Sequence, residues 1–189
     1  MLQDIFSKRK KDIMSKKDKS HAGSWDKRIL KLCDKINENE NYYTTSSCSG
    51  RIVLMISQNK KAPNLFLKIY HDKISFQQLK KDLIETSRKG KKLIKLKMEV
   101  CALNVACRDL ESVKKLFAVA RSSGWKRAGI MISDKRIMLS LNSTEKLEFP
   151  VISDGKILVS DNFLKIVVKE SGEKLQKGWE KIQKLERFL

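Results

Sequence analysis

The sequence predicts an α+β, or mixed α/β, fold in which a mixed sheet with hairpins and several helices form one domain of 189 residues. Segments with the 3.6-residue period of a helix alternate with segments that have the alternation or the continuous apolar run of a strand. Short hairpins occur among them, which points away from a regular doubly wound sheet. None of the eight glycines forms a G-x-G-x-x-G fingerprint, so a dinucleotide-binding fold is not expected.

The charge balance indicates a polyanionic partner. Lys and Arg number 41 against 22 Asp and Glu, which gives a formal net charge of +19 and a pI near 9.8. Such a balance is typical of nucleic-acid binding, because cations that neutralise phosphates release counterions. A lysine-rich solvated surface, as in heat-adapted proteins, is the alternative. No apolar window approaches the roughly 18 residues of a membrane span and the N-terminus is charged, so we expect a cytoplasmic protein without a membrane partner.

The cysteines do not form a metal-binding pattern. The four cysteines lie far apart, and only two histidines accompany them. A zinc site is therefore not expected. We expect Cys33, Cys101 and Cys107 to be reduced core residues and Cys48 to be the exception.

The chain begins with a basic segment for which we predict a helix over about residues 4–20. Phe6, Ile13 and Met14 have the spacing of one apolar helix face. The cations between them could contact RNA phosphates, although a merely solvated face fits the pattern as well. These cations are Lys8, Arg9, Lys10, Lys11, Lys16 and Lys17.

A second helix is predicted over about residues 25–39, with Ser24 as its N-cap. Asp26 then lies in the first turn, where a carboxylate complements the helix dipole. A polar segment of residues 42–51 follows, which we expect to be a loop that leads into a buried strand over residues 52–56.

The remaining elements have clearer boundaries. The predicted order is a strand over 65–70, a helix from Ser75 to Lys89, a strand over 94–102, a helix from Leu110 to Gly124, a hairpin of 128–133 with 136–141, a short strand over 157–159 and a C-terminal helix over about 161–188. His71 follows the strand over 65–70. A histidine there is most often a surface residue, and catalysis is the alternative.

The segment from Thr44 to Arg51 has the composition of an anion-binding loop. Small hydroxylated residues and Gly50 let backbone N–H groups approach an anion, and Arg51 supplies a fork for a carboxylate or phosphate. An ordinary solvated turn is the alternative.

The run from Tyr43 to Ile52 also resembles the (Ser/Thr)-x-Ser-Ser-Cys-x-Gly-Arg signature of the wybutosine-synthesising methyltransferases of eukaryotes and archaea. The resemblance extends over about residues 6–188 and includes Val105 to Arg108, Ser122 to Ile130 and Leu147 to Pro150. The sequence departs from it at three places. Asn104 stands where relatives often have histidine, Val100-Cys101 where a proline-containing pair is common, and Asn142 where a basic residue is frequent.

The resemblance implies an archaeal-type enzyme with a non-Rossmann methyltransferase fold. It implies transfer of a methyl group from S-adenosyl-L-methionine to N(4) of the 7-aminocarboxypropyl-demethylwyosine base in phenylalanine tRNA, reached at the anticodon stem-loop. It makes Asp26 and His71 the catalytic candidates, which we expect to converge on the anion-binding segment. The cofactor candidates are Thr44, Ser46, Ser47, Cys48, Gly50 and Arg51.

Tyr43 and Arg127 join the N-terminal cations as candidate RNA contacts, and Tyr43 is otherwise a core residue. The rival hypotheses are a non-catalytic RNA-binding module, in which the loop contacts phosphate only, and a structural ribosome-associated protein. The sequence makes no prediction of the oligomeric state.

Overall fold

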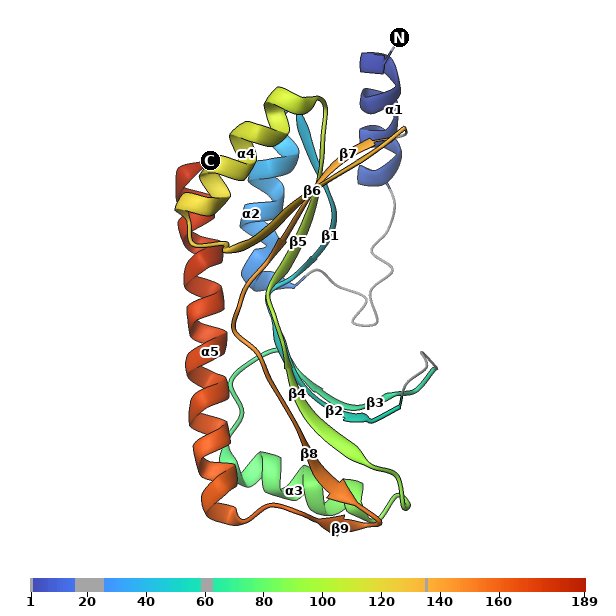
Figure 1. Ribbon diagram of the computed structural model, residues 1–189, viewed down its shortest axis with the longest axis vertical. Helices are drawn as coiled ribbons and strands as arrows, with labels where there is room; N and C mark the ends of the chain where they lie inside the picture. Colours follow the sequence, from blue (N-terminus) through green and yellow to red (C-terminus); the bar gives the residue numbers. More distant parts are fainter. Residues whose placement is uncertain (1, 16–25, 59–62, 135) are drawn as a thin grey trace. The chain divides into compact units, whose positions relative to one another are not determined.

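A computed structural model describes residues 2–15, 26–58, 63–134 and 136–189 (Figure 1). The contacts divide the chain into two compact units. The first unit comprises Met1–Ser49, Cys101–Thr144 and Trp179–Leu189, and the second comprises Gly50–Val100 and Glu145–Gly178. Among the described residues, no helix is both long and apolar enough to cross a bilayer.

The first unit is built on a four-stranded antiparallel sheet in the order β1-β5-β7-β6. Its elements are α1 (Leu2–Met14), α2 (Lys27–Glu38), β1 (Tyr42–Cys48), β5 (Ala102–Cys107), α4 (Leu110–Ser122), β6 (Arg127–Ser133) and β7 (Arg136–Asn142). Alternate residues of a strand face opposite sides, so the sheet has two distinct faces.

Helices α2 and α4 cover one face of this sheet (Figure 1). Their apolar stripes meet sheet residues that are fully buried, such as Leu103, Val105 and Leu139. The Tyr42 hydroxyl donates to the carbonyl oxygen of Ser112 at 2.9 Å and ties β1 to α4. Helix α1 contacts the opposite face, where Phe6 and Ile13 pack against Tyr43, Ala106 and Met138.

The second unit contains a five-stranded antiparallel sheet in the order β3-β2-β4-β8-β9, with α3 packed against β8 and β9. Its elements are β2 (Arg51–Ile56), β3 (Phe66–Tyr70), α3 (Phe76–Ser87), β4 (Ile94–Glu99), β8 (Leu147–Ser153), β9 (Lys156–Ile157) and the first part of α5 (Asp161–Phe188). Alternate residues of β4 are buried, and so are Leu79 and Leu83 of α3.

The α+β class, the non-Rossmann arrangement and the long C-terminal helix are confirmed. A mixed sheet was expected, whereas the structure has two sheets in which all described strand pairs are antiparallel. The helix from Ser75, the helix that ends before Gly124 and the hairpin of β6 with β7 also form as predicted.

Several predicted boundaries are wrong. The segment that was expected to be a loop is mostly strand β1, because its hydroxyl groups hydrogen-bond to neighbours and its backbone pairs with β5. The predicted strand over 94–102 is two strands, since the chain passes from one sheet to the other at Val100 and Cys101. Strand β8 was missed because it contains Pro150, and proline is uncommon within a sheet. Pro150 lies beside the register shift between β4 and β8, and it has no pairing partner in β9.

The N-terminal boundaries also differ. Helix α1 ends at Met14. Lys16, Lys17 and Ser24 lie outside the described residues. Asp26 is the N-cap of α2 rather than a first-turn residue, and the short strand near the C-terminal helix is Lys156–Ile157.

Candidate active site

Strand β1 divides the predicted cofactor residues between the two faces of the first sheet. On the α2 side, the Thr44 backbone N–H donates to Asn37 Oδ1 at 2.7 Å, and Asn37 Nδ2 donates to Thr44 Oγ1 at 3.1 Å. Ser47 hydrogen-bonds to Cys33 on the same helix, while burial raises the pKa of that thiol to about 11. Thr44 and Ser47 therefore hold β1 against α2.

The opposite face carries small and polar residues in two adjacent rows. A bulge between Thr44 and Ser46 shifts the register, so that Ser46 pairs with Asn104. Asn104 in turn pairs with Ser140 of β7, and Ser140 pairs with Gly129 of β6. The next row runs from Cys48 through Ala102 and Asn142 to Arg127. Directly paired residues share one face of a sheet. We call the polar or reactive members of these rows the polar shelf: Ser46, Cys48, Asn104, Arg127, Ser140 and Asn142.

The polar shelf is partly accessible, and its amides hydrogen-bond to neighbouring serines. Ser46 and Arg127 are exposed, while the other four members are half-buried. Asn104 Nδ2 donates to Ser46 Oγ at 2.8 Å, and Asn142 Nδ2 donates to Ser140 Oγ at 3.3 Å. Each amide also has a second N–H and a carbonyl oxygen. Small side chains with donors and acceptors on a flat strand surface can receive a planar, polar ligand.

Helix α1 bounds the shelf at one end. The next row of this face is Tyr43, Ala106 and Met138, which α1 covers. The ring centroids of Tyr43 and Phe6 are 5.1 Å apart, and Tyr43 is only 3% exposed. Burial raises the pKa of Tyr43, and the nearby charges of Arg136 and Arg9 oppose this shift. In this structure Tyr43 packs against Phe6, as its alternative as a core residue implies.

Helix α1 also holds the four described cations of the N-terminal cluster. Lys8 and Lys11 are exposed, whereas Arg9 and Lys10 are half-buried. Lys10 Nζ donates to the Asn39 carbonyl oxygen at 2.6 Å. Burial and the charge of Arg108 lower the pKa of Lys10. The two exposed lysines are thus the members of this cluster most open to RNA.

Asp26 connects the start of α2 to the end of β1. Its Oδ1 accepts the backbone N–H of Arg28 at 3.2 Å, and its Oδ2 accepts the backbone N–H of Ser49 at 2.8 Å. The Cys101 thiol donates to the Ser49 carbonyl oxygen at 2.7 Å. Ser49 Oγ is buried and, among the described residues, has no hydrogen-bond partner. Gly50 follows with a φ of +92°, a conformation that favours glycine.

Arg51 and His71 belong to the second unit. Arg51 Nε donates to Glu99 Oε2 at 2.6 Å, and its guanidinium lies 4.8 Å from the centroid of the Phe66 ring. Burial opposes ionisation of Glu99, but Arg51 and Lys97 outweigh it and lower the pKa of that carboxyl. The Arg51 fork therefore already has one carboxylate partner. His71 is exposed just after β3.

The structure brings some predicted residues together and reveals others. Asp26, Thr44, Ser46, Ser47, Cys48, Tyr43 and Arg127 share the first unit. Asn104, Ser140 and Asn142 were not predicted as site residues. Their signal was a polar residue between apolar ones, as in Leu139-Ser140-Leu141, but only the pairing of strands shows that the three share one face.

The comparisons with known proteins agree with the resemblance of the sequence. The profile of the family described as Methyltransferase TYW3 matches residues 8–189. A Methanocaldococcus jannaschii protein, named tRNA(Phe) 7-((3-amino-3-carboxypropyl)-4-demethylwyosine(37)-N(4))-methyltransferase, is 35% identical over 176 residues, which cover 91% of this chain and 90% of that protein. The tRNA wybutosine-synthesizing protein 3 homolog of Bos taurus is 31% identical over 190 residues, which cover 97% of this chain and 72% of that protein.

A solved structure has the same fold. The PH1069 protein from Pyrococcus horikoshii superposes with a TM-score of 0.87 at 29% identity, covering 98% of this chain and 94% of that one. Sequence and fold therefore agree over nearly the whole length, and the chain belongs to the Methyltransferase TYW3 family.

Proposed function

We propose that this chain methylates N(4) of the 7-(3-amino-3-carboxypropyl)-4-demethylwyosine base of phenylalanine tRNA, with S-adenosyl-L-methionine as the methyl donor. The observation that carries the proposal is the family match over residues 8–189, together with the name of the Methanocaldococcus jannaschii relative. A methyl donor follows from membership of a methyltransferase family. We propose S-adenosyl-L-methionine as this donor and the anticodon stem-loop as the part of the tRNA that is bound.

The first unit supplies groups that fit this donor. The polar shelf offers Ser46 and Cys48 from the signature, and the buried Ser49 Oγ could be satisfied by a polar group of a ligand. Thr44 and Ser47 act by holding β1 in place, and Gly50 allows the turn after it. Arg51 belongs to the second unit and is a cofactor candidate from the family resemblance; its terminal amino groups would contact a carboxylate, since its Nε contacts Glu99. When bound, the donor supplies an electrophilic methyl carbon.

The protein's own task is alignment and removal of one proton. Methyl transfer to an N–H nitrogen releases that proton, so a nearby base aids the reaction. Both oxygens of Asp26 already accept backbone N–H groups, which favours a positioning role for Asp26. We therefore assign proton acceptance to the exposed imidazole of His71. This assignment rests on the family resemblance and on the chemistry of the residue.

The RNA contacts in the proposal are cations. Lys8, Lys11 and Arg127 are exposed and can meet phosphates, and the net charge of +19 favours a polyanion. Arg9 and Lys10 are half-buried and contribute chiefly to the positive electrostatic potential around α1. Lys16 and Lys17 keep the role inferred from the sequence.

The test is methylation by the purified chain. Phenylalanine tRNA that carries the demethylated precursor is incubated with S-adenosyl-L-methionine, and its nucleosides are analysed by mass spectrometry. We expect a gain of one methyl group on the modified base beside the anticodon. A folded protein that binds tRNA but leaves this base unchanged would contradict the proposal and favour the non-catalytic RNA-binding module.

The role of His71 has its own test. His71→Asn should lower the methylation rate by about 100-fold, because the amide cannot accept the proton. The affinity for tRNA should stay within about twofold, because one exposed side chain contributes little to a many-contact interface. Full methylation by folded His71→Asn would exclude this residue from the chemistry.

A further inference from the structure

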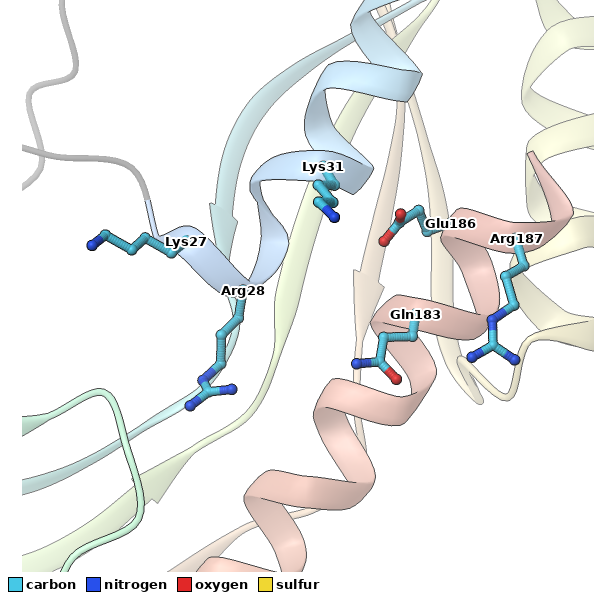
Figure 2. A pocket seen from close by; sticks show the side chains of 6 residues that line it. All are labelled: Lys27, Arg28, Lys31, Gln183, Glu186 and Arg187. Atoms are coloured by element: carbon cyan, nitrogen blue, oxygen red, sulfur yellow. The ribbon is translucent and has the colours of Figure 1, made fainter.

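A basic cleft lies in the first unit between the start of α2 and the end of α5, away from the signature residues in the sequence. It has a volume of about 280 Å³ and is lined by Lys27, Arg28, Lys31, Gln183, Glu186 and Arg187 (Figure 2). Four of these side chains are cations and one is an anion. None of the six belongs to the predicted site.

The cations of α2 are placed where the helix itself does not favour them. The N-terminus of a helix carries a partial positive charge, which cations in the first turn oppose. Helix α2 has Lys27 and Arg28 there and no acidic first-turn residue, while the N-cap, Asp26, supplies a carboxylate at this end. Among the described residues, no ion pair joins Lys27 or Lys31 to a carboxylate. An anion held in the cleft would relieve this local repulsion.

A purely structural reading explains only part of the cluster. Cations complement the negative C-terminal end of a helix, and Lys35 Nζ indeed donates to the Glu186 carbonyl oxygen of α5 at 2.8 Å. Arg187 lies in the last turn of α5 and fits the same role. Lys27, Arg28 and Lys31 lie in the first two turns of α2, where this reading gives them no function.

One cation of the cleft is already fixed in position. The Arg28 guanidinium lies 3.7 Å from the centroid of the Trp179 ring, an attractive cation–π geometry. A guanidinium is a planar fork of N–H donors, a geometry that suits phosphate oxygens. Figure 2 shows the side chains of Lys31 and Glu186 pointing toward one another.

We propose that this cleft binds phosphodiester groups of the tRNA substrate, as a contact separate from the polar shelf and from α1. The inference rests on the proposed function for the identity of the RNA. The chemistry is that of backbone recognition, with several cations, one preorganised arginine and an open, polar cleft. Such contacts position the RNA and do not read its sequence.

The test compares two variants with the same change in charge. Lys31→Gln/Arg187→Gln removes two cations of the cleft, and Lys169→Gln/Lys177→Gln removes two exposed cations of α5 in the second unit. Binding of precursor phenylalanine tRNA is measured by fluorescence anisotropy between about 50 and 200 mM salt. For the cleft variant, we expect a plot of log affinity against log salt that is shallower by about 1.5, and roughly 5- to 10-fold weaker binding at low salt. The control variant should change affinity by less than about twofold.

A third variant is expected to bind tRNA more tightly than wild type. Glu186→Gln removes the carboxylate of the cleft and should strengthen tRNA binding by roughly twofold. Equal affinities and slopes for the cleft variant and its control would overturn the inference. So would a loss of calorimetric S-adenosyl-L-methionine affinity in the cleft variant without a change in tRNA affinity.

The two proposals fail separately. If the wild-type chain methylates the tRNA while the cleft variant binds like its control, the proposed function stands and the cleft inference is wrong. If the wild-type chain does not methylate the tRNA but the cleft variant still loses salt-dependent binding, the cleft inference stands and the proposed function is wrong.

Discussion

The two units use polar side chains in different ways. In the second unit, buried Asp82 accepts hydrogen bonds from the Tyr70 hydroxyl at 2.6 Å and from Gln78 Nε2 at 2.7 Å, and Lys68 Nζ lies 3.1 Å from its other oxygen. In the first unit, Asn104 and Asn142 each donate one hydrogen bond within the polar shelf and are only half-buried. A closed network stabilises a fold, whereas an open one can accept a ligand.

We expect the Asp82 network to stabilise the second unit and the polar shelf to take part in methyl transfer. Tyr70, Gln78 and Lys68 all contact the Asp82 carboxylate inside the second unit, so a ligand of this carboxylate would have to displace one of them. The polar shelf requires no such displacement. Substitutions in the second network should therefore act on stability, and substitutions in the shelf should act on methyl transfer.

Asp82→Ala should have the largest effect on stability. Removal of the carboxylate leaves the Tyr70 hydroxyl and Gln78 without their acceptor and should lower the free energy of unfolding by about 3 kcal/mol, measured by urea denaturation. Glu85→Ala is the matched control, because Glu85 contacts the same lysine but its side chain is 46% exposed against 4% for Asp82. The control should change stability by less than about 0.5 kcal/mol. Similar losses in both variants would contradict the contrast between the two networks.

Asn104→Leu should have the largest effect on methyl transfer. Loss of the amide removes donors and an acceptor from the shelf and should lower kcat/KM by roughly 100-fold, or about 2.7 kcal/mol of transition-state stabilisation. The free energy of unfolding should change by less than about 1 kcal/mol, because the side chain is half-buried on a strand that tolerates leucine. Asn162→Leu makes the same chemical change at an exposed position of α5 and should leave the rate unaltered. A normal rate in Asn104→Leu would remove the shelf from the proposed site.

The sequence predicted most helices but only part of the polar shelf. Helix α3 was predictable because Ser75 and Gln78 are close in the chain and their cap is a local interaction. Strand β1 was mistaken for a loop because its stability comes from Asn37 and from pairing with β5, which are not local. The signature located Ser46 and Cys48, whereas the shelf partners Asn104 and Ser140 required knowledge of the register.

Substitution of Asp26 tests how much each of its two backbone contacts stabilises the fold. Asp26→Ser can still cap α2 through its hydroxyl, but it is too short to reach the Ser49 N–H as well. We expect a loss of about 1 kcal/mol in the free energy of unfolding, against about 2 kcal/mol for Asp26→Ala, which loses both contacts. Stability of the two variants is measured by thermal and urea unfolding. If Asp26→Ser is as unstable as Asp26→Ala, the cap is not the contact that matters.

The smallest expected effect concerns pH and the Arg51–Glu99 pair of the second unit. The pKa of Glu99 is lowered from its ordinary value of 4.5, since Arg51 and Lys97 outweigh its burial. Its charge therefore stabilises the fold above pH 4.5, and this contribution is lost as the pH falls through the lowered pKa. Glu99→Gln should be less stable than wild type by about 1 kcal/mol at pH 7, with the gap narrowing toward pH 3.

The matched control for Glu99 is Glu148→Gln. It breaks the more exposed pair with Lys95 in the same sheet, where the Nζ and Oε1 atoms are 3.0 Å apart. Because both partners are largely solvated, its effect at pH 7 should be below about 0.5 kcal/mol. Equal effects of the two substitutions would mean that the Arg51 guanidinium is not committed to Glu99. It would then be free to bind a ligand carboxylate through its whole fork, and the second unit would be less closed than its hydrogen bonds indicate.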